Sequence, residues 1–151
     1  MRLSMALLFG LTGAAGLLAA DGEPKPDARY GIELDLNSYP QDTPKAALAS
    51  VLKAANAGKF NYLVAQLADP SFIDDRVKRL FGGDFEEQVK DTRARLDPSA
   101  VKELHRFLSD GEWKIGEAEA AVRLKDVSDR AVFFRKIEGR WFLEHPSKPK
   151  I

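Results

Sequence analysis

The chain has 151 residues and contains no cysteine. It therefore cannot form disulfides, thiolate metal sites, a cysteine nucleophile or a lipid anchor through an N-terminal cysteine. None of its asparagines begins an Asn-x-Ser/Thr glycosylation sequence. In an exported chain, that absence favours a bacterial source.

An excess of charge of one sign is also missing. Lys plus Arg and Asp plus Glu each number 23, and the two signs are interspersed along the chain. A nucleic-acid interface needs a basic stripe on one side, and an anionic membrane attracts a chain with net positive charge. The composition therefore predicts neither nucleic acid nor a charged membrane surface as a partner.

One long apolar run is present, in the first twenty residues, MRLSMALLFGLTGAAGLLAA. A single positive charge at Arg2 precedes an apolar stretch that ends in small residues, which is the plan of a secretory signal peptide. Glycines interrupt the run and no basic stop follows it, so we expect cleavage and no stable membrane insertion afterwards. Residues 1–20 therefore predict an exported protein, periplasmic or extracellular, that is not a cysteine-anchored lipoprotein.

The remainder predicts a single α+β domain over residues 43–145, because the length suits one domain with its own core. Residues 21–42 are polar and rich in proline, and we expect a flexible linker there. Within it, IELDLNSYPQ alternates in hydropathy and could add a short edge strand. Residues 146–151 are expected to be a disordered tail.

Helical periodicity fills the first part of the domain and predicts about four to five helices. Each begins or ends at a known signal: a capping Thr or Asp, a proline at the first helical position, or a glycine stop. The stretch from Ser71 to Asp74 could instead be a short strand. The predicted helices cover residues 43–58, 60–70, 71–83, 84–96 and 97–111.

From Glu112 onward, the apolar period changes from about 3.6 to 2, which marks a switch to an antiparallel sheet. We expect three to four strands, of which the last two form a hairpin from Ala131 to His145. Glu138-Gly139 is expected to be its two-residue turn. The predicted fold is therefore α+β, with N-terminal helices packed on a C-terminal antiparallel sheet.

This hairpin carries large apolar groups on both faces. A two-residue turn places Arg135 opposite Phe142, where it could stack as a cation over the ring. A sheet with one face in water is polar on that face. The second face should thus be half-buried, against other side chains of the chain, a ligand or a second copy. One face has Val132, Phe134, Trp141 and Leu143; the second has Ala131, Phe133, Ile137 and Phe142 with Arg135, Arg140 and Glu144.

The preceding strand leaves the identity of the core face open. A four-residue loop at 126–129 places Val122 and Leu124 beside Phe133, and a three-residue loop places them beside Phe134 and Trp141. A slip of one residue reverses the assignment, because side chains alternate between faces.

The order of elements and the ending DRAVFFRKIEGRWFLEH, with Gly-Arg-Trp after the turn, resemble the NTF2-like (cystatin-like α+β) superfamily over Thr43 to His145. The resemblance implies helices folded over a curved antiparallel sheet, with a cone-like pocket between them. Members range from polyketide cyclases and steroid isomerases to transport factors and subunits without chemistry. In the enzymes, an Asp or His base lies in the cone, and no residue here can be matched to such a motif.

His105 is the one weak candidate for a catalytic residue. The period of residues 97–111 places it on the inner side of its helix, where burial could adjust its pKa for general-base work. The alternative is a histidine at the edge of the core whose polar groups are satisfied by the backbone. The two histidines lie forty residues apart among scattered carboxylates, which gives no metal-ligand spacing. We expect no metal site and no cofactor.

These observations lead to three hypotheses. The first is an exported, non-enzymatic binding or assembly module that uses the sheet face or a cone-like pocket, with a small-molecule ligand or a homodimer through the sheet face as its partner. Its candidate residues are Phe133, Arg135, Phe142 and Arg140. The second is a cyclase- or isomerase-like enzyme with His105 or an Asp as the base. The third is a structural protein of the cell envelope.

Overall fold

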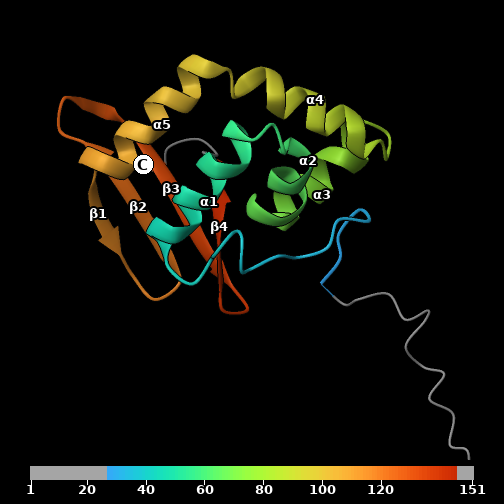
Figure 1. The fold of residues 1–151 in the computed structure, drawn as a ribbon, viewed down its shortest axis with the longest axis horizontal. Coiled ribbons are helices and arrows are strands. Elements are labelled where there is room, and N and C mark those ends of the chain that lie inside the picture. Colours follow the sequence, from blue (N-terminus) through green and yellow to red (C-terminus); the bar gives the residue numbers. More distant parts are fainter. Residues whose placement is uncertain (1–26, 146–151) are drawn as a thin grey trace, which may run out of the picture.

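The computed structural model describes residues 27–145, apart from the side chains of Ser128 and Asp129. The predicted signal peptide and tail lie outside this range. Within this range, five α-helices and one π-helical turn are followed by a four-stranded antiparallel sheet, which confirms the α+β class. Figure 1 shows how the helices lie against the sheet. The helices are α1 (Pro44–Asn56), α2 (Phe60–Tyr62), the π-helical η1 (Leu63–Leu67), α3 (Pro70–Arg79), α4 (Phe85–Arg95) and α5 (Pro98–Asp110). The strands are β1 (Glu112–Ile115), β2 (Glu119–Leu124), β3 (Val127–Ile137) and β4 (Arg140–Glu144).

Three helices begin at the predicted caps. The Oγ atom of Thr43 accepts a hydrogen bond from the N–H of Ala46 at 3.0 Å at the start of α1. Asp84 caps α4 and Asp97 caps α5 in the same way. Because each cap satisfies an N–H group that has no partner inside the helix, local sequence determines where these helices begin.

The region around Pro70 differs in part from the prediction. The helix expected over 60–70 ends before Pro70, which instead occupies the first turn of α3. The capping residue of α3, Asp69, accepts a hydrogen bond from the N–H of Ser71 at 3.0 Å. The stretch from Ser71 to Asp74 is therefore helical, and the alternative of a short strand is wrong. The preceding helix ends at Leu67 in a π-helical turn that brings Ala68 beside Leu143 of β4.

The sheet is a meander in the order β1-β2-β3-β4. The turn at Glu138 and Gly139 has positive φ at both residues, as a two-residue hairpin turn requires. It gives the predicted pairing of Arg135 with Phe142. Of the two loops left open between β2 and β3, the four-residue loop at 126–129 is wrong, because Val127 already pairs with Leu124 and the register shifts between Arg123 and Leu124.

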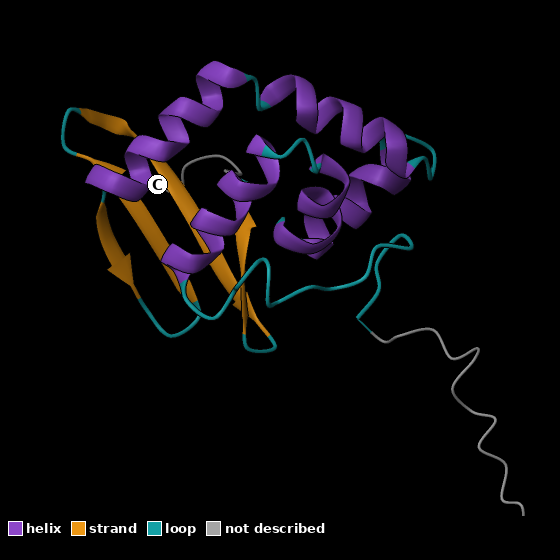
Figure 2. Cartoon of the chain, in the orientation of Figure 1, coloured by secondary structure: helices purple, strands orange, loops and turns teal. Residues whose placement is uncertain are grey.

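That register identifies the inner face of the sheet. Val122 pairs with Val132, so it shares a face with Phe134 and Trp141, and these residues are buried in one cluster with Phe107 of α5. Leu48 and Leu52 of α1 complete that core. Figure 2 shows α1 and α5 lying over this face. A second cluster joins α1 to α2, η1, α3 and α4 beyond β4.

Gly111 connects the helices to the sheet. Its φ of −72° is open to any residue, so it is not a left-handed helix stop. A Cβ atom at this position would lie 2.3 Å from both the carbonyl oxygen of Phe107 and a methyl group of Val122. Gly111 therefore allows α5 and β2 to approach each other closely.

Candidate functional site

The outer face of the sheet, defined as the face turned away from α1 and α5, is the candidate site. Its central row crosses all four strands in the order Lys114, Ala121, Phe133 and Glu144. Of these, Ala121 and Phe133 are half-buried, although neither belongs to the two hydrophobic clusters of the described chain. An aromatic side chain therefore lies on a sheet face outside the packed core.

Phe133 has charged neighbours of both signs. The guanidinium of Arg123 lies 5.9 Å from the centre of its ring, a cation–π distance. In the same row, Lys114 and Glu144 stand at opposite ends. The periodicity of β1 and β2 could have indicated Lys114, Ala121 and Arg123, but only with a known register of these strands against β3.

An open depression of about 930 Å³ includes Phe133 and its neighbours. Its lining comes from both faces of the sheet, for example Ala121 on the outer face and Phe107 and Val132 on the inner side. Because hydrogen-bonded strands separate these groups, the volume is not a single enclosed chamber. An open surface of this kind suits a macromolecular partner better than a small molecule, which binds in a more enclosed pocket.

Two of the four predicted face residues are used inside the protein. Phe142 is only 3% exposed, and the guanidinium of Arg140 lies 4.8 Å from its ring centre. Arg140, rather than the predicted Arg135, makes this cation–π contact. Its Nη2 atom donates at 2.9 Å to the side-chain oxygen of Gln41 and at 3.1 Å to the carbonyl of Gln66. Burial lowers the pKa of Arg140 below its ordinary value.

Arg135 remains exposed but has a partner at the edge of the sheet. Its guanidinium lies 3.5 Å from the carboxylate of Asp69, which is itself buried. Asp69 also caps α3 and donates its backbone N–H to the carbonyl of Leu143 at 2.9 Å. Of the predicted face residues, Phe133 is thus the one without an internal polar or core role.

The N-terminal segment, residues 27–42, makes specific contacts with the helices, whereas the sequence predicted a flexible linker. The predicted edge strand is not formed, because only an isolated bridge joins Arg29 and Ile32. Between them, Tyr30 and Gly31 form a tight turn with positive φ at both residues. Gln66 holds the segment by donating to the carbonyl groups of Asp27 and Ile32, both at 2.8 Å.

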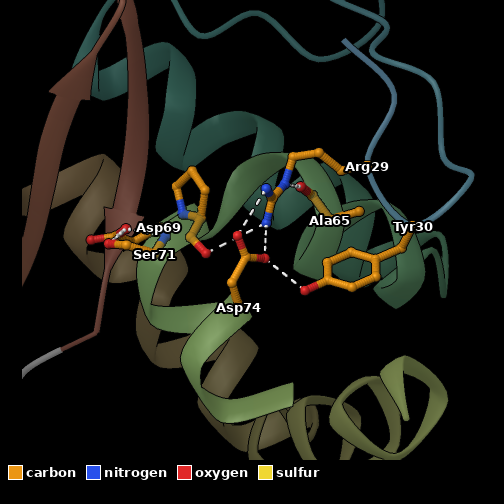
Figure 3. Close-up of polar contacts among 7 residues, drawn as sticks. Arg29, Tyr30, Ala65, Asp69, Ser71 and Asp74 are labelled. Atoms are coloured by element: carbon orange, nitrogen blue, oxygen red, sulfur yellow. Dashed lines mark hydrogen bonds and ion pairs between the residues drawn. The ribbon is translucent and has the colours of Figure 1, made fainter. Parts of the chain in front are cut away.

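Asp74 is the anchor for that turn (Figure 3). Its carboxylate accepts hydrogen bonds from Arg29 and from the hydroxyl of Tyr30, both at 2.6 Å. Burial and the bond to Asp74 raise the pKa of Tyr30 from 10.0 to about 12. Burial would raise the pKa of Asp74, but the bonds from Arg29 and Tyr30 outweigh it and lower that pKa. The ring of Tyr30 stacks on Phe85 at 4.3 Å.

The two histidines do not form a catalytic arrangement. His105 is exposed on α5, so the prediction that it faces inward is wrong. His145 stacks on Phe72, and burial together with the positive charges of Arg76 and Arg95 lowers its pKa. Neither imidazole makes a hydrogen bond to another described residue, although a general base needs a partner to orient it.

Residues 27–145 contain neither a metal-binding cluster nor a helix that could span a membrane. In that range no three His, Asp or Glu side chains lie together so as to hold a metal ion. The helices of the same range are all too short or too polar to cross a membrane.

Comparison with known proteins identifies no relative of this chain. No protein-family model, curated protein or solved structure shows a significant match to the chain.

Proposed function

We propose that the chain is an exported, non-enzymatic binding module whose outer sheet face contacts another protein. The observation that carries this proposal is the position of Phe133, which is half-buried on a sheet face that lies outside both hydrophobic clusters. Aromatic residues are enriched in protein interfaces, where they supply contact area at low entropic cost.

The charges around Phe133 favour a protein partner. Lys114, Arg123 and Glu144 surround the apolar centre with both signs of charge. A polar rim around an apolar centre is the usual anatomy of a protein–protein interface. A nucleic acid would instead require a surface of uniformly positive charge.

The packing of the inner face supports a function without catalysis. The expected NTF2-like cone would lie between the helices and this face, and we retain that family as a proposal from element order alone. Leu48, Phe107 and Phe134 fill the space there, each at most 3% exposed. The contacts around these three side chains are apolar, and Nε1 of Trp113, which packs against the same cluster, is buried without a hydrogen-bond partner in the described chain.

The proposal is tested by affinity purification of the tagged protein from its native cells. Phe133→Ser should remove a defined set of co-purifying proteins, whereas Phe81→Ser should retain it. Phe81 is a matched control, because it is another half-buried phenylalanine but lies after α3, away from the sheet. Equal recovery with both variants would contradict the proposal, provided that both melt near the wild-type temperature.

Export is tested separately by determining the N-terminal residue of the protein recovered from those cells. A start directly after Ala15 or after Ala20 supports cleavage of the predicted signal peptide. A chain that retains Arg2 within a cytoplasmic fraction would contradict it.

A further inference from the structure

The two edges of the sheet differ in how they are covered. At the β4 edge, the N–H of Trp141 donates to the carbonyl of Gln41, and the side-chain amide of Gln41 donates back to the carbonyl of Trp141, both at 2.9 Å. The N–H of Asp69 donates to the carbonyl of Leu143. At the β1 edge, by contrast, no residue within 27–145 hydrogen-bonds to the outward backbone groups. An open edge of this kind can pair with another strand.

The hydrogen bond that closes the β1–β2 turn shows which groups are available on β1. The N–H of Gly116 donates to the carbonyl of Glu119 at 2.8 Å, so Gly116 directs its backbone toward β2. Along an antiparallel strand, successive residues direct their backbone N–H and C=O groups alternately toward one neighbouring strand and toward the opposite side. Glu112 and Lys114 therefore also direct their backbone groups toward β2, and Trp113 and Ile115 direct theirs toward the open edge.

We propose that β1 pairs antiparallel with β1 of a second copy around a two-fold axis at Trp113. The two Trp113 residues then exchange backbone hydrogen bonds, and the N–H of each Ile115 reaches the carbonyl of Gly111 of the second copy. On the outer face, Glu112 comes to lie opposite Lys114 of the second copy, and the same contact repeats by symmetry. The two four-stranded sheets thereby become one continuous sheet.

Charge selects this register over its neighbours. Any other register must also keep the outer faces of the two copies on the same side of the joined sheet. Because side chains alternate between faces, the sum of the two paired residue numbers can then change only in steps of two. One such shift places Lys114 opposite Lys114, and the other places Glu112 opposite Glu112. Like charges directly opposite each other destabilise a pair of strands, and opposite charges stabilise it. A lysine on an edge normally discourages pairing, but here Glu112 neutralises it.

The proposed dimer through β1 does not depend on the proposed function of the outer face, so an experiment can contradict one proposal and leave the other standing. A four-residue strand makes a small interface, so we expect a weak dimer that forms with rising concentration. The ion pair of Glu112 with Lys125 does not prevent it, because both side chains are largely exposed and such pairs contribute little.

Charge reversal tests the dimer by sedimentation velocity over a wide range of concentrations, using protein expressed from the full chain. The wild-type protein should shift toward twice the monomer mass as concentration rises. Lys114→Glu and Glu112→Lys should each remain monomeric. An equimolar mixture of these two variants should dimerise again, because the heterodimer restores opposite charges at both contacts.

Lys78→Glu is the matched control, since it makes the same charge change at an exposed position on α3, and it should dimerise like the wild type. A wild-type chain that stays monomeric at every concentration would overturn the proposal. So would single variants that dimerise like the wild type, or a mixture that stays monomeric although both variants melt normally. If Phe133→Ser loses its co-purifying proteins but still forms the dimer, the β1 edge and the outer face act independently.

Discussion

Phe133 and Phe134 are neighbours in β3 and lie on opposite faces of the sheet. Phe134 is fully buried between the sheet and the helices, whereas Phe133 is half-buried on the outer face. One residue step therefore separates a residue of the core from a residue available for contact.

Alanine at these two positions should have very different effects on stability. Phe134→Ala should lower the free energy of unfolding by about 3–5 kcal/mol, because it leaves a cavity in the core. Phe133→Ala should cost about 1 kcal/mol or less, as is usual for partly exposed positions. Urea denaturation measures both. Equal losses would mean that the outer face is packed like the core.

Gln41 should be more important for stability than its polar character suggests. Its side chain is 1% exposed and connects Arg140, the carbonyl of Gln66 and the carbonyl of Trp141. Gln41→Ala leaves the carbonyl of Trp141 without its donor and removes one bond each from Arg140 and the carbonyl of Gln66, which still bond to each other. We therefore expect a loss of about 1–3 kcal/mol. Asp42→Ala, at the exposed next position, should change stability by less than about 0.5 kcal/mol. Equal and small effects in chemical denaturation would contradict this account of the β4 edge.

Gly111→Ala should destabilise the fold although its backbone conformation is ordinary. The new methyl group would lie 2.3 Å from the carbonyl oxygen of Phe107 and from a methyl group of Val122, so α5 and β2 must move apart. Overpacking of this kind costs about 1–3 kcal/mol. Thermal melting should show a clear decrease for Gly111→Ala and a smaller one for Gly116→Ala, whose nearest contact is 3.2 Å. A melting temperature of Gly111→Ala equal to the wild-type value would exclude the close approach.

The contact of Tyr30 with Asp74 should stabilise the N-terminal turn within a limited pH range. The pKa of Asp74 is lowered, so its contribution is present above the ordinary value of 3.8 and is lost as the pH falls through the folded value. The pKa of Tyr30 is raised to about 12, so its contribution is present below 10.0 and is lost as the pH rises toward 12. Hydrogen exchange at residues 29–32 should therefore accelerate at both extremes.

Ultraviolet titration of the wild type and of Tyr30→Phe isolates the contribution of Tyr30 among the three tyrosines, although burial raises the pKa of Tyr62 as well. At about pH 11, between its ordinary and shifted pKa values, Tyr30 should contribute little tyrosinate absorbance. Tyr30→Phe should accordingly leave the absorbance near that pH almost unchanged. A drop of one full tyrosinate would show that the contact with Asp74 does not perturb Tyr30.

Local chemistry explains which parts of the fold could be predicted from sequence. The caps at Thr43, Asp84 and Asp97 act within three residues, and the turn at Glu138-Gly139 fixes the register of its own hairpin. The period change at Glu112 likewise reflects alternation along a single strand. These features need no knowledge of distant residues.

The features that sequence reasoning missed depend on distant partners. Gln41 meets Trp141 across a separation of 100 residues, and Arg29 meets Asp74 across 45. The pairing of Val127 with Leu124 sets the register that decides which face of the sheet belongs to the core, and no local sequence pattern indicates this pairing. His105 was placed inward by periodicity, but α5 turns that position toward solvent. For the candidate site, the sequence identified Phe133 but could not show that Phe142 and Arg140 are occupied internally.

Site-specific photo-crosslinking in native cells tests the proposed binding face most directly. A photoreactive phenylalanine analogue replaces Phe133 in one variant and Phe81 in another, and crosslinked products are identified by mass spectrometry. The proposed function predicts one dominant protein product at position 133 that is absent at position 81 and weakened by Arg123→Glu. The same products at both positions, or none at position 133, would contradict the assignment of the outer sheet face as the binding surface.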